Sequence, residues 1–217
     1  MPIQKRSETT GFTIVELIIA TSVFSVILLM CASALIQVGR IYQKGVIGVQ
    51  TQEVTRSVIA SLAEAIQFSG DDIRTIPSNN GSNGFCVDSK QYSYRLDRKL
   101  VDTAPNTDQT RHALVVDSVS GCGATTAQNL ANVNVNGNEL LSPNMRLLQV
   151  LICIPGPVDA TCPNRPPDGS NLYQVSVTVA YGDGDLLSAG KCNSIAIGGS
   201  FCAVSSLSTT VQKRIVN

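Results

Sequence analysis

The sequence predicts an α+β protein in which one long N-terminal helix packs against an antiparallel β-sheet. Three observations lead to this class. Residues 11–38 form an apolar stretch long enough to cross a membrane. Residues 41–68 contain no proline, and their apolar side chains recur mostly four positions apart. From residue 85 onwards, short β-branched runs alternate with turn-forming residues.

The first element is the apolar stretch, which predicts a membrane-spanning helix. Between Leu17 and Val38 none of the 22 residues is Asp, Glu, Lys, Arg or His. At about 1.5 Å per residue they give a helix of roughly 33 Å, enough for a hydrocarbon core of about 30 Å. Lys5 and Arg6 precede this helix, so the positive-inside rule keeps the N-terminus in the cytoplasm and exports the rest.

Glu16 stands at the start of this stretch and needs a partner. A charged side chain at the centre of a spanning helix costs roughly 3 kcal/mol, and less near the interface. Residues 1–11 are polar and basic and end in Gly11, and no small-residue cleavage site follows the apolar run. A cut after Gly11 would create an amino group on Phe12, one helical turn from Glu16. The amine and the carboxylate would then compensate each other, and between neighbouring subunits the same pairing would set the register.

At these residues the chain resembles a type IV prepilin. The resemblance lies in Lys5-Arg6, Gly11, Phe12-Thr13 and Glu16, followed by an unbroken apolar helix, and it covers about residues 5–40. It implies cleavage after Gly11 by a membrane prepilin peptidase and methylation of the Phe12 amine. It also implies assembly through the apolar helix with other pilin subunits, served by the inner-membrane pilus assembly machinery.

One departure from the family pattern concerns the middle of this helix. Many major pilins have a proline or glycine two to three turns into the helix, where it can unwind during assembly. This chain has Ser25 and Ser33 there. We therefore expect an intact helix, and a minor rather than a major subunit.

The helix is expected to continue beyond the membrane, from about residue 12 to residue 68, with Gly70 as its stop signal. The predicted organisation is a cleaved leader at 1–11, a membrane and assembly helix at 12–39, and an extended helix with a disulfide-containing β-rich head at 40–217. The apolar positions expected to face the head are Ile47, Val54, Val58, Leu62, Ala65 and Ile66.

The head is expected to contain one meandering antiparallel sheet of roughly four to six strands. Its loops are predicted at 71–84 and 121–143. Residues 145–154 have apolar side chains at both odd and even positions, which predicts a central strand with both faces covered. In residues 172–181 apolar and polar side chains alternate, which predicts a strand with one buried face. The predicted strands are 85–87, 91–96, 113–119, 145–154, 172–181 and 204–215.

The cysteines predict an oxidising compartment. Cys31 lies in the apolar helix, and the other six fall on the exported side. Six cysteines allow 15 connectivities. Short-loop closure favours Cys153–Cys162 and Cys192–Cys202 and leaves Cys86–Cys122. The family resemblance also favours the last pair of the chain, because type IV pilins often close a C-terminal loop with a disulfide.

The sequence predicts no catalytic residue, metal ligand or cofactor. His112 is the only histidine and stands in no nucleophile motif. Asp183-Gly184-Asp185 has calcium-binding oxygens, but a hairpin turn is the simpler interpretation. Cys153 and Cys162 lack zinc-site spacing.

Nucleic acid is not an expected partner. Lys213 and Arg214 are two adjacent cations without clustered aromatic residues, and such pairs are more often solvated. In the whole chain Lys+Arg 16 balance Asp+Glu 16, so no net charge attracts a polyanion.

The leading hypothesis is therefore a structural, minor subunit of a type IV pilus. It would be a single-pass protein of the cytoplasmic membrane with its head outside, and later part of the pilus at the cell surface. The first alternative is a pseudopilin of a type II secretion system, which shares the N-terminal features. The second is a membrane-anchored extracytoplasmic binding domain that does not polymerise. No group of residues in the sequence has the pattern of a catalytic site, so an anchored enzyme is not supported.

Overall fold

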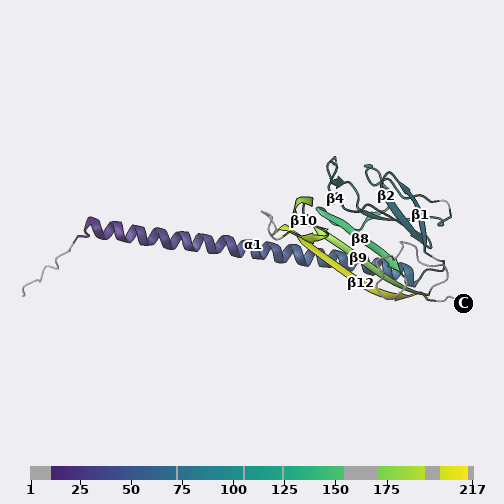
Figure 1. Ribbon diagram of the computed structural model, residues 1–217, viewed down its shortest axis with the longest axis horizontal. Coiled ribbons are helices and arrows are strands. Elements are labelled where there is room, and N and C mark those ends of the chain that lie inside the picture. Colours follow the sequence, from purple (N-terminus) through teal and green to yellow (C-terminus); the bar gives the residue numbers. More distant parts are fainter. Residues whose placement is uncertain are drawn as a thin grey trace, which may run out of the picture. The chain divides into compact units, whose positions relative to one another are not determined.

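The computed structural model describes residues 11–71, 73–104, 106–123, 125–153, 171–193 and 201–214. The chain divides into two compact units, residues 1–42 and 43–217, and each is described by itself. One helix, α1, spans Ile14–Gln67 without interruption (Figure 1). The predicted helix is thus confirmed to within two residues at each end. Of the predicted leader, residues 1–10 lie outside the described residues.

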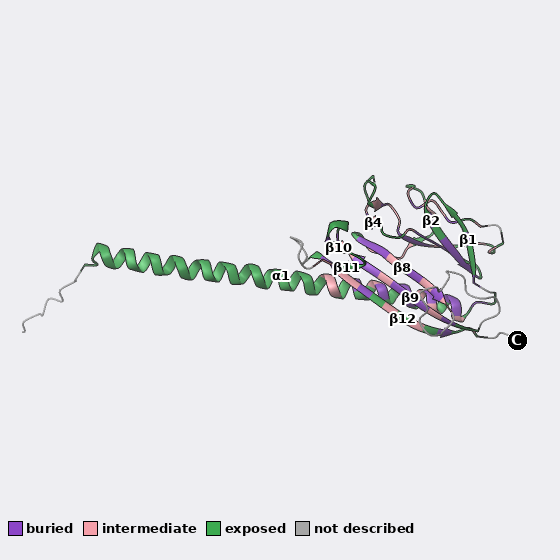
Figure 2. Ribbon diagram, in the orientation of Figure 1, coloured by how far each residue is buried: buried purple, intermediate pink, exposed green. Residues whose placement is uncertain are grey.

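The helical part of the first unit is apolar and exposed. Its side chains are exposed throughout, which Figure 2 shows as an unbroken green stretch. The most apolar 18-residue window of α1 contains no buried residue. This helix is long and apolar enough to span a membrane, as a single-pass anchor requires. The helix is intact at Ser25 and Ser33, as expected.

In the second unit the remaining part of α1 buries one face. Thr51 and Thr55 are fully buried, and their hydroxyls are satisfied there by donating to the backbone oxygens of Ile47 and Thr51, each at 2.7 Å. These threonines were not predicted from the sequence, since only apolar positions were counted there. The predicted apolar face is confirmed, with Ile47 and Val54 partly buried. The buried residues of α1 are Thr51, Thr55, Val58, Ile59, Leu62, Ala65 and Ile66.

The head contains two main antiparallel sheets rather than the single one that the sequence predicts. The five-stranded sheet has the order β1-β2-β3-β6-β7, and the three-stranded sheet has the order β12-β9-β8. The strands of the first are β1 (Arg74–Asn79), β2 (Ser82–Val87), β3 (Lys90–Tyr94), β6 (Leu114–Ser118) and β7 (Asn138–Glu139). Those of the second are β8 (Met145–Cys153), β9 (Leu172–Tyr181) and β12 (Ala203–Gln212).

Two short strand pairs and a turn of 3₁₀ helix complete the described head. The parallel pair is β4 (Lys99–Leu100) with β5 (Gln109–Thr110), and the antiparallel pair is β10 (Leu187–Ser188) with β11 (Lys191–Cys192). The 3₁₀ helix η1 spans Gly184–Leu186. Both sheets and α1 share one core, which explains why a prediction from periodicity could not separate them. Core residues include Val58, Leu62, Ile66, Phe85, Tyr92, Leu114, Leu147, Val177 and Val211.

The prediction of a loop at 71–84 is wrong, because β1 and the start of β2 occupy most of these residues. Asn80 and Gly81 have φ of 46° and 76°, and Asn79 pairs with Ser82 across them. Two central residues with positive φ make the tight turn that matches strand twist, and Asn-Gly is its commonest sequence. Pro77 is tolerated because β1 is an edge strand.

The prediction of a central strand at 145–154 is also wrong, since β8 lies at the edge of its sheet. Its register shifts between Leu147 and Gln149, which is a bulge, and Leu148 and Leu151 are only partly covered. The prediction for 172–181 is confirmed at both ends by β9. Where strands are predicted at 85–87 and 91–96, β2 and β3 form a hairpin, and the pair Val87↔Lys90 flanks its turn.

The structure contains the disulfides Cys86–Cys122 and Cys192–Cys202, as predicted. Cys153 is also disulfide-bonded, and Cys162 lies outside the described residues. Cys31 is a free, exposed thiol in α1.

Candidate functional site in the apolar N-terminal helix

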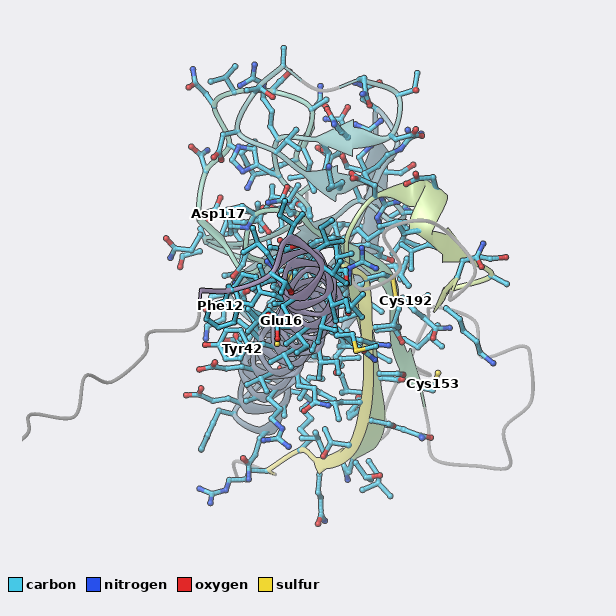
Figure 3. The ribbon with its side chains drawn as sticks, turned by 90° about the vertical axis from the view of Figure 1, so that its left-hand side faces the viewer. Phe12, Glu16, Tyr42, Asp117, Cys153 and Cys192 are labelled. Atoms are coloured by element: carbon cyan, nitrogen blue, oxygen red, sulfur yellow. A yellow bond between two sulfur atoms is a disulfide. The ribbon has the colours of Figure 1, made fainter. Side chains whose placement is uncertain are left out.

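Thr13 and Glu16 cap the start of α1 through reciprocal hydrogen bonds. The Oε2 atom of Glu16 accepts from the Thr13 backbone N–H at 3.0 Å and from the Thr13 hydroxyl at 2.9 Å. In return, the Glu16 N–H donates to Thr13 Oγ1 at 3.3 Å. This is a capping box, which satisfies two of the backbone donors that a helix start leaves free. Figure 3 looks onto this end of the helix, where Phe12 and Glu16 are labelled.

Thr13 was not predicted as a partner of Glu16, for which only the Phe12 amine was named. The signal was present, because Thr13-Ile14-Val15-Glu16 has the spacing of a capping box ahead of an apolar run. Phe12 lies directly before the cap, and it is 88 % exposed. The pairing of a free Phe12 amine with Glu16 stays a prediction.

The hydroxyl groups of the apolar segment are satisfied within the helix itself. Each donates to a backbone oxygen three or four residues earlier, so none needs water. In hydrocarbon an unsatisfied hydroxyl would be costly, and these contacts remove that cost. The bonds are Thr21 to Leu17 and to Ile18 at 3.0 Å each, Ser22 to Ile19 at 2.8 Å, Ser25 to Thr21 at 2.8 Å and Ser33 to Met30 at 2.8 Å.

The large apolar side chains of this segment are exposed on all sides of the helix. A surface of this kind is stable only against lipid or other apolar helices. It therefore has two possible partners, a bilayer and a bundle of similar helices. The exposed residues include Ile14, Val15, Leu17, Ile18, Ile19, Val23, Phe24, Leu29, Met30, Leu35 and Ile36.

In the head, the lone histidine contacts a half-buried carboxylate. The Nδ1 atom of His112 lies 3.7 Å from Glu139 Oε2, and Glu139 accepts backbone N–H bonds from Ala113 and Leu114 at 2.9 Å and from Leu141 at 3.1 Å. Burial raises the pKa of Glu139, and the backbone donors and His112 partly oppose this. These contacts tie β7 to β6, which is a structural role for the carboxylate.

Two further residues considered from the sequence, Asp183 and Arg214, have structural partners. Asp183 is the N-cap residue of η1 and forms an ion pair with Lys99, so the predicted hairpin turn is a 3₁₀ turn instead. Within the described residues, no group of three or more His, Cys, Asp or Glu is placed to hold a metal ion. The guanidinium of Arg214 lies over the Phe68 ring, 5.1 Å from its centroid.

Comparisons of the chain with protein-family models, with curated proteins and with solved structures find no match. The function is therefore inferred from this chain's own residues. The N-terminal segment places a capping carboxylate, Glu16, in the first turn of a helix whose next 22 residues are uncharged.

Proposed function

We propose that this chain is a structural subunit, and a minor one, of a type IV pilus. The observation that carries the proposal is the start of α1. A single carboxylate, Glu16, stands in the first turn of an unbroken helix whose next 22 residues carry no charge and are exposed. Lys5-Arg6 and Gly11 precede it, as in the prepilin leader that the sequence resembles.

The capping box leaves Glu16 able to bind a second partner. Both bonds from Thr13 go to Oε2, and among the described residues no bond to Oε1 is found. A carboxylate has about four acceptor positions, so Oε1 is available to a cation. After a cut between Gly11 and Phe12, the new amine at Phe12, of this subunit or a neighbour, would supply that cation.

The same features support a location first in the cytoplasmic membrane and then in the pilus. The apolar helix would hold the subunit in the cytoplasmic membrane after the prepilin peptidase has acted, with the head outside. The apolar helices of other subunits would then replace lipid as the subunit enters the pilus. The disulfides of the head are consistent with an oxidising exterior.

A pseudopilin of a type II secretion system is the second candidate, because the same N-terminal features support it. The experiment is to shear and purify surface filaments from cells that express the chain, and to probe them with an antibody against the head. Presence in the filaments supports the pilus subunit. Presence in the membrane fraction alone, with defective secretion on deletion, would support the pseudopilin.

A membrane-anchored binding domain that does not polymerise is the third candidate. It needs the apolar helix but has no use for a cut after Gly11. Such a protein would retain residues 1–11 and would be absent from any filament.

A further inference from the structure

Two adjoining hollows open in the head, around the start of β8 and the segment that follows β9. The larger has a volume of about 560 Å³ and the smaller about 210 Å³. Both are lined by Asp108, Arg146 and Gly184, and together they are called the Arg146 groove here. Its size falls in the range of sites for small ligands, roughly 300–1,000 Å³.

Arg146 has more hydrogen-bond donors than the described partners use. It is only 3 % exposed, yet its bonds are long, from Nη1 to Asp97 Oδ1 at 3.4 Å and from Nη2 to the Gly182 oxygen at 3.3 Å. Its Nε has no partner among the described residues. A guanidinium carries five donors, and buried ones are normally satisfied. Arg146 therefore has unused hydrogen-bond donor capacity at the wall of the groove.

The groove is lined by two cations, Lys99 and Arg146, and by four carboxylates, those of Asp97, Asp108, Asp183 and Asp185. Arg146 pairs with Asp97, Lys99 pairs with Asp183, and Arg98 lies 4.0 Å from Asp108. Because both cations are paired and carboxylates are in excess, a strongly anionic ligand would be repelled. The lining therefore disfavours an anionic ligand, and its mixture of donors and acceptors fits a neutral ligand that can both donate and accept hydrogen bonds.

Apolar side chains form another part of the wall. Leu148, Leu187 and Ala189 line the larger hollow together with the polar groups. Ala189 and Gly190 form the turn of the β10–β11 hairpin, and the Cys192–Cys202 disulfide ties this hairpin to the start of β12. This wall is thus held in place by a covalent bond.

We propose that the Arg146 groove binds a neutral saccharide. Sugar hydroxyls donate to carboxylates such as Asp108 and accept from Arg146 and the side-chain amides of Asn106 and Gln109. The C–H face of a sugar ring packs on Leu148 and Leu187. This proposal does not depend on assembly into a pilus, since it concerns the head alone.

The test uses the full chain in a zwitterionic detergent without a sugar headgroup. An array of neutral, sialylated and sulfated oligosaccharides is probed with the wild type and with D108A, R146K and D102A. Asp102 is an exposed aspartate of the same loop as Asp108 and lines neither hollow, so D102A is the matched control. Thermal melting checks that each variant is folded.

We expect binding to at least one neutral oligosaccharide, weakened about tenfold or more in D108A and R146K and unchanged in D102A. If R146K does not fold, D108A against D102A decides the outcome. The proposal is overturned if no neutral oligosaccharide binds, if only sialylated or sulfated ones bind, or if D108A binds as the wild type does.

Discussion

Thr13 and Glu16 bond to each other in both directions across the first turn of α1. The Glu16 carboxylate accepts from the Thr13 N–H at 3.0 Å, and the Glu16 N–H donates to the Thr13 hydroxyl at 3.3 Å. Glu16 thus has a partner in its own chain before any neighbour is considered. Its capping role and its proposed assembly role can be separated by substitution.

Glutamine at position 16 separates the two roles, because it also completes a capping box but carries no charge. We expect E16Q to insert in the membrane and to retain its helix start, but to be depleted from sheared filaments. T13A should lose about 1 kcal/mol of helix capping and keep the charge. Immunoblots of filament and membrane fractions measure the distribution. Normal incorporation of E16Q would contradict a role for the charge in assembly.

Glu139 is predicted to be important for the stability of the head. E139A leaves the N–H groups of Ala113, Leu114 and Leu141 without their acceptor. Leaving a buried donor without its acceptor costs about 1–3 kcal/mol, so the free energy of unfolding should fall by about this amount or more. Urea unfolding of the full chain in micelles measures it. Removal of the exposed carboxylate of Glu53 in E53A is the control and should change stability little.

The raised pKa of Glu139 predicts a pH dependence of stability. The folded state binds this proton more tightly than the unfolded state, whose pKa is near the ordinary value of 4.5. The contribution of the protonated Glu139 to the stability of the fold is therefore fully present below pH 4.5 and is lost as the pH rises through the pKa of the folded state. Melting temperatures across this window should fall more steeply with pH for the wild type than for E139Q. Equal slopes would show that Glu139 does not titrate there.

The two described disulfides should differ in their effect on stability. Cys86 and Cys122 are 36 residues apart in sequence, and Cys192 and Cys202 are 10 apart. By loop-closure entropy they contribute roughly 4 and roughly 3 kcal/mol respectively. The C86S/C122S variant should therefore unfold at lower urea than C192S/C202S. The opposite order would mean that side-chain packing outweighs loop entropy.

The elements that the sequence predicted well are those with a strong period. Along α1 the four-residue spacing placed Val58, Leu62 and Ile66 in the core, and along β9 the two-residue alternation placed Val175 and Val177 there. These periods follow from one buried face on each element. The pair Cys192–Cys202 could be predicted for a similar reason, because a short loop depends only on local spacing.

The elements that were mispredicted depend on tertiary contacts or on turn chemistry. β1 has no clear alternation and is defined by the Asn80-Gly81 turn. β8 is apolar on both faces but pairs with a strand on one side only along most of its length. The Arg146 groove draws its lining from several separate segments, so no local pattern in the sequence could indicate it.

The mature N-terminus of the chain recovered from sheared filaments tests the central claim most directly. Mass spectrometry of the N-terminal peptide should show that residues 1–11 are missing and that the chain begins at a methylated Phe12. A chain that still carries residues 1–11 and is found only in the membrane fraction would contradict the proposed pilus subunit.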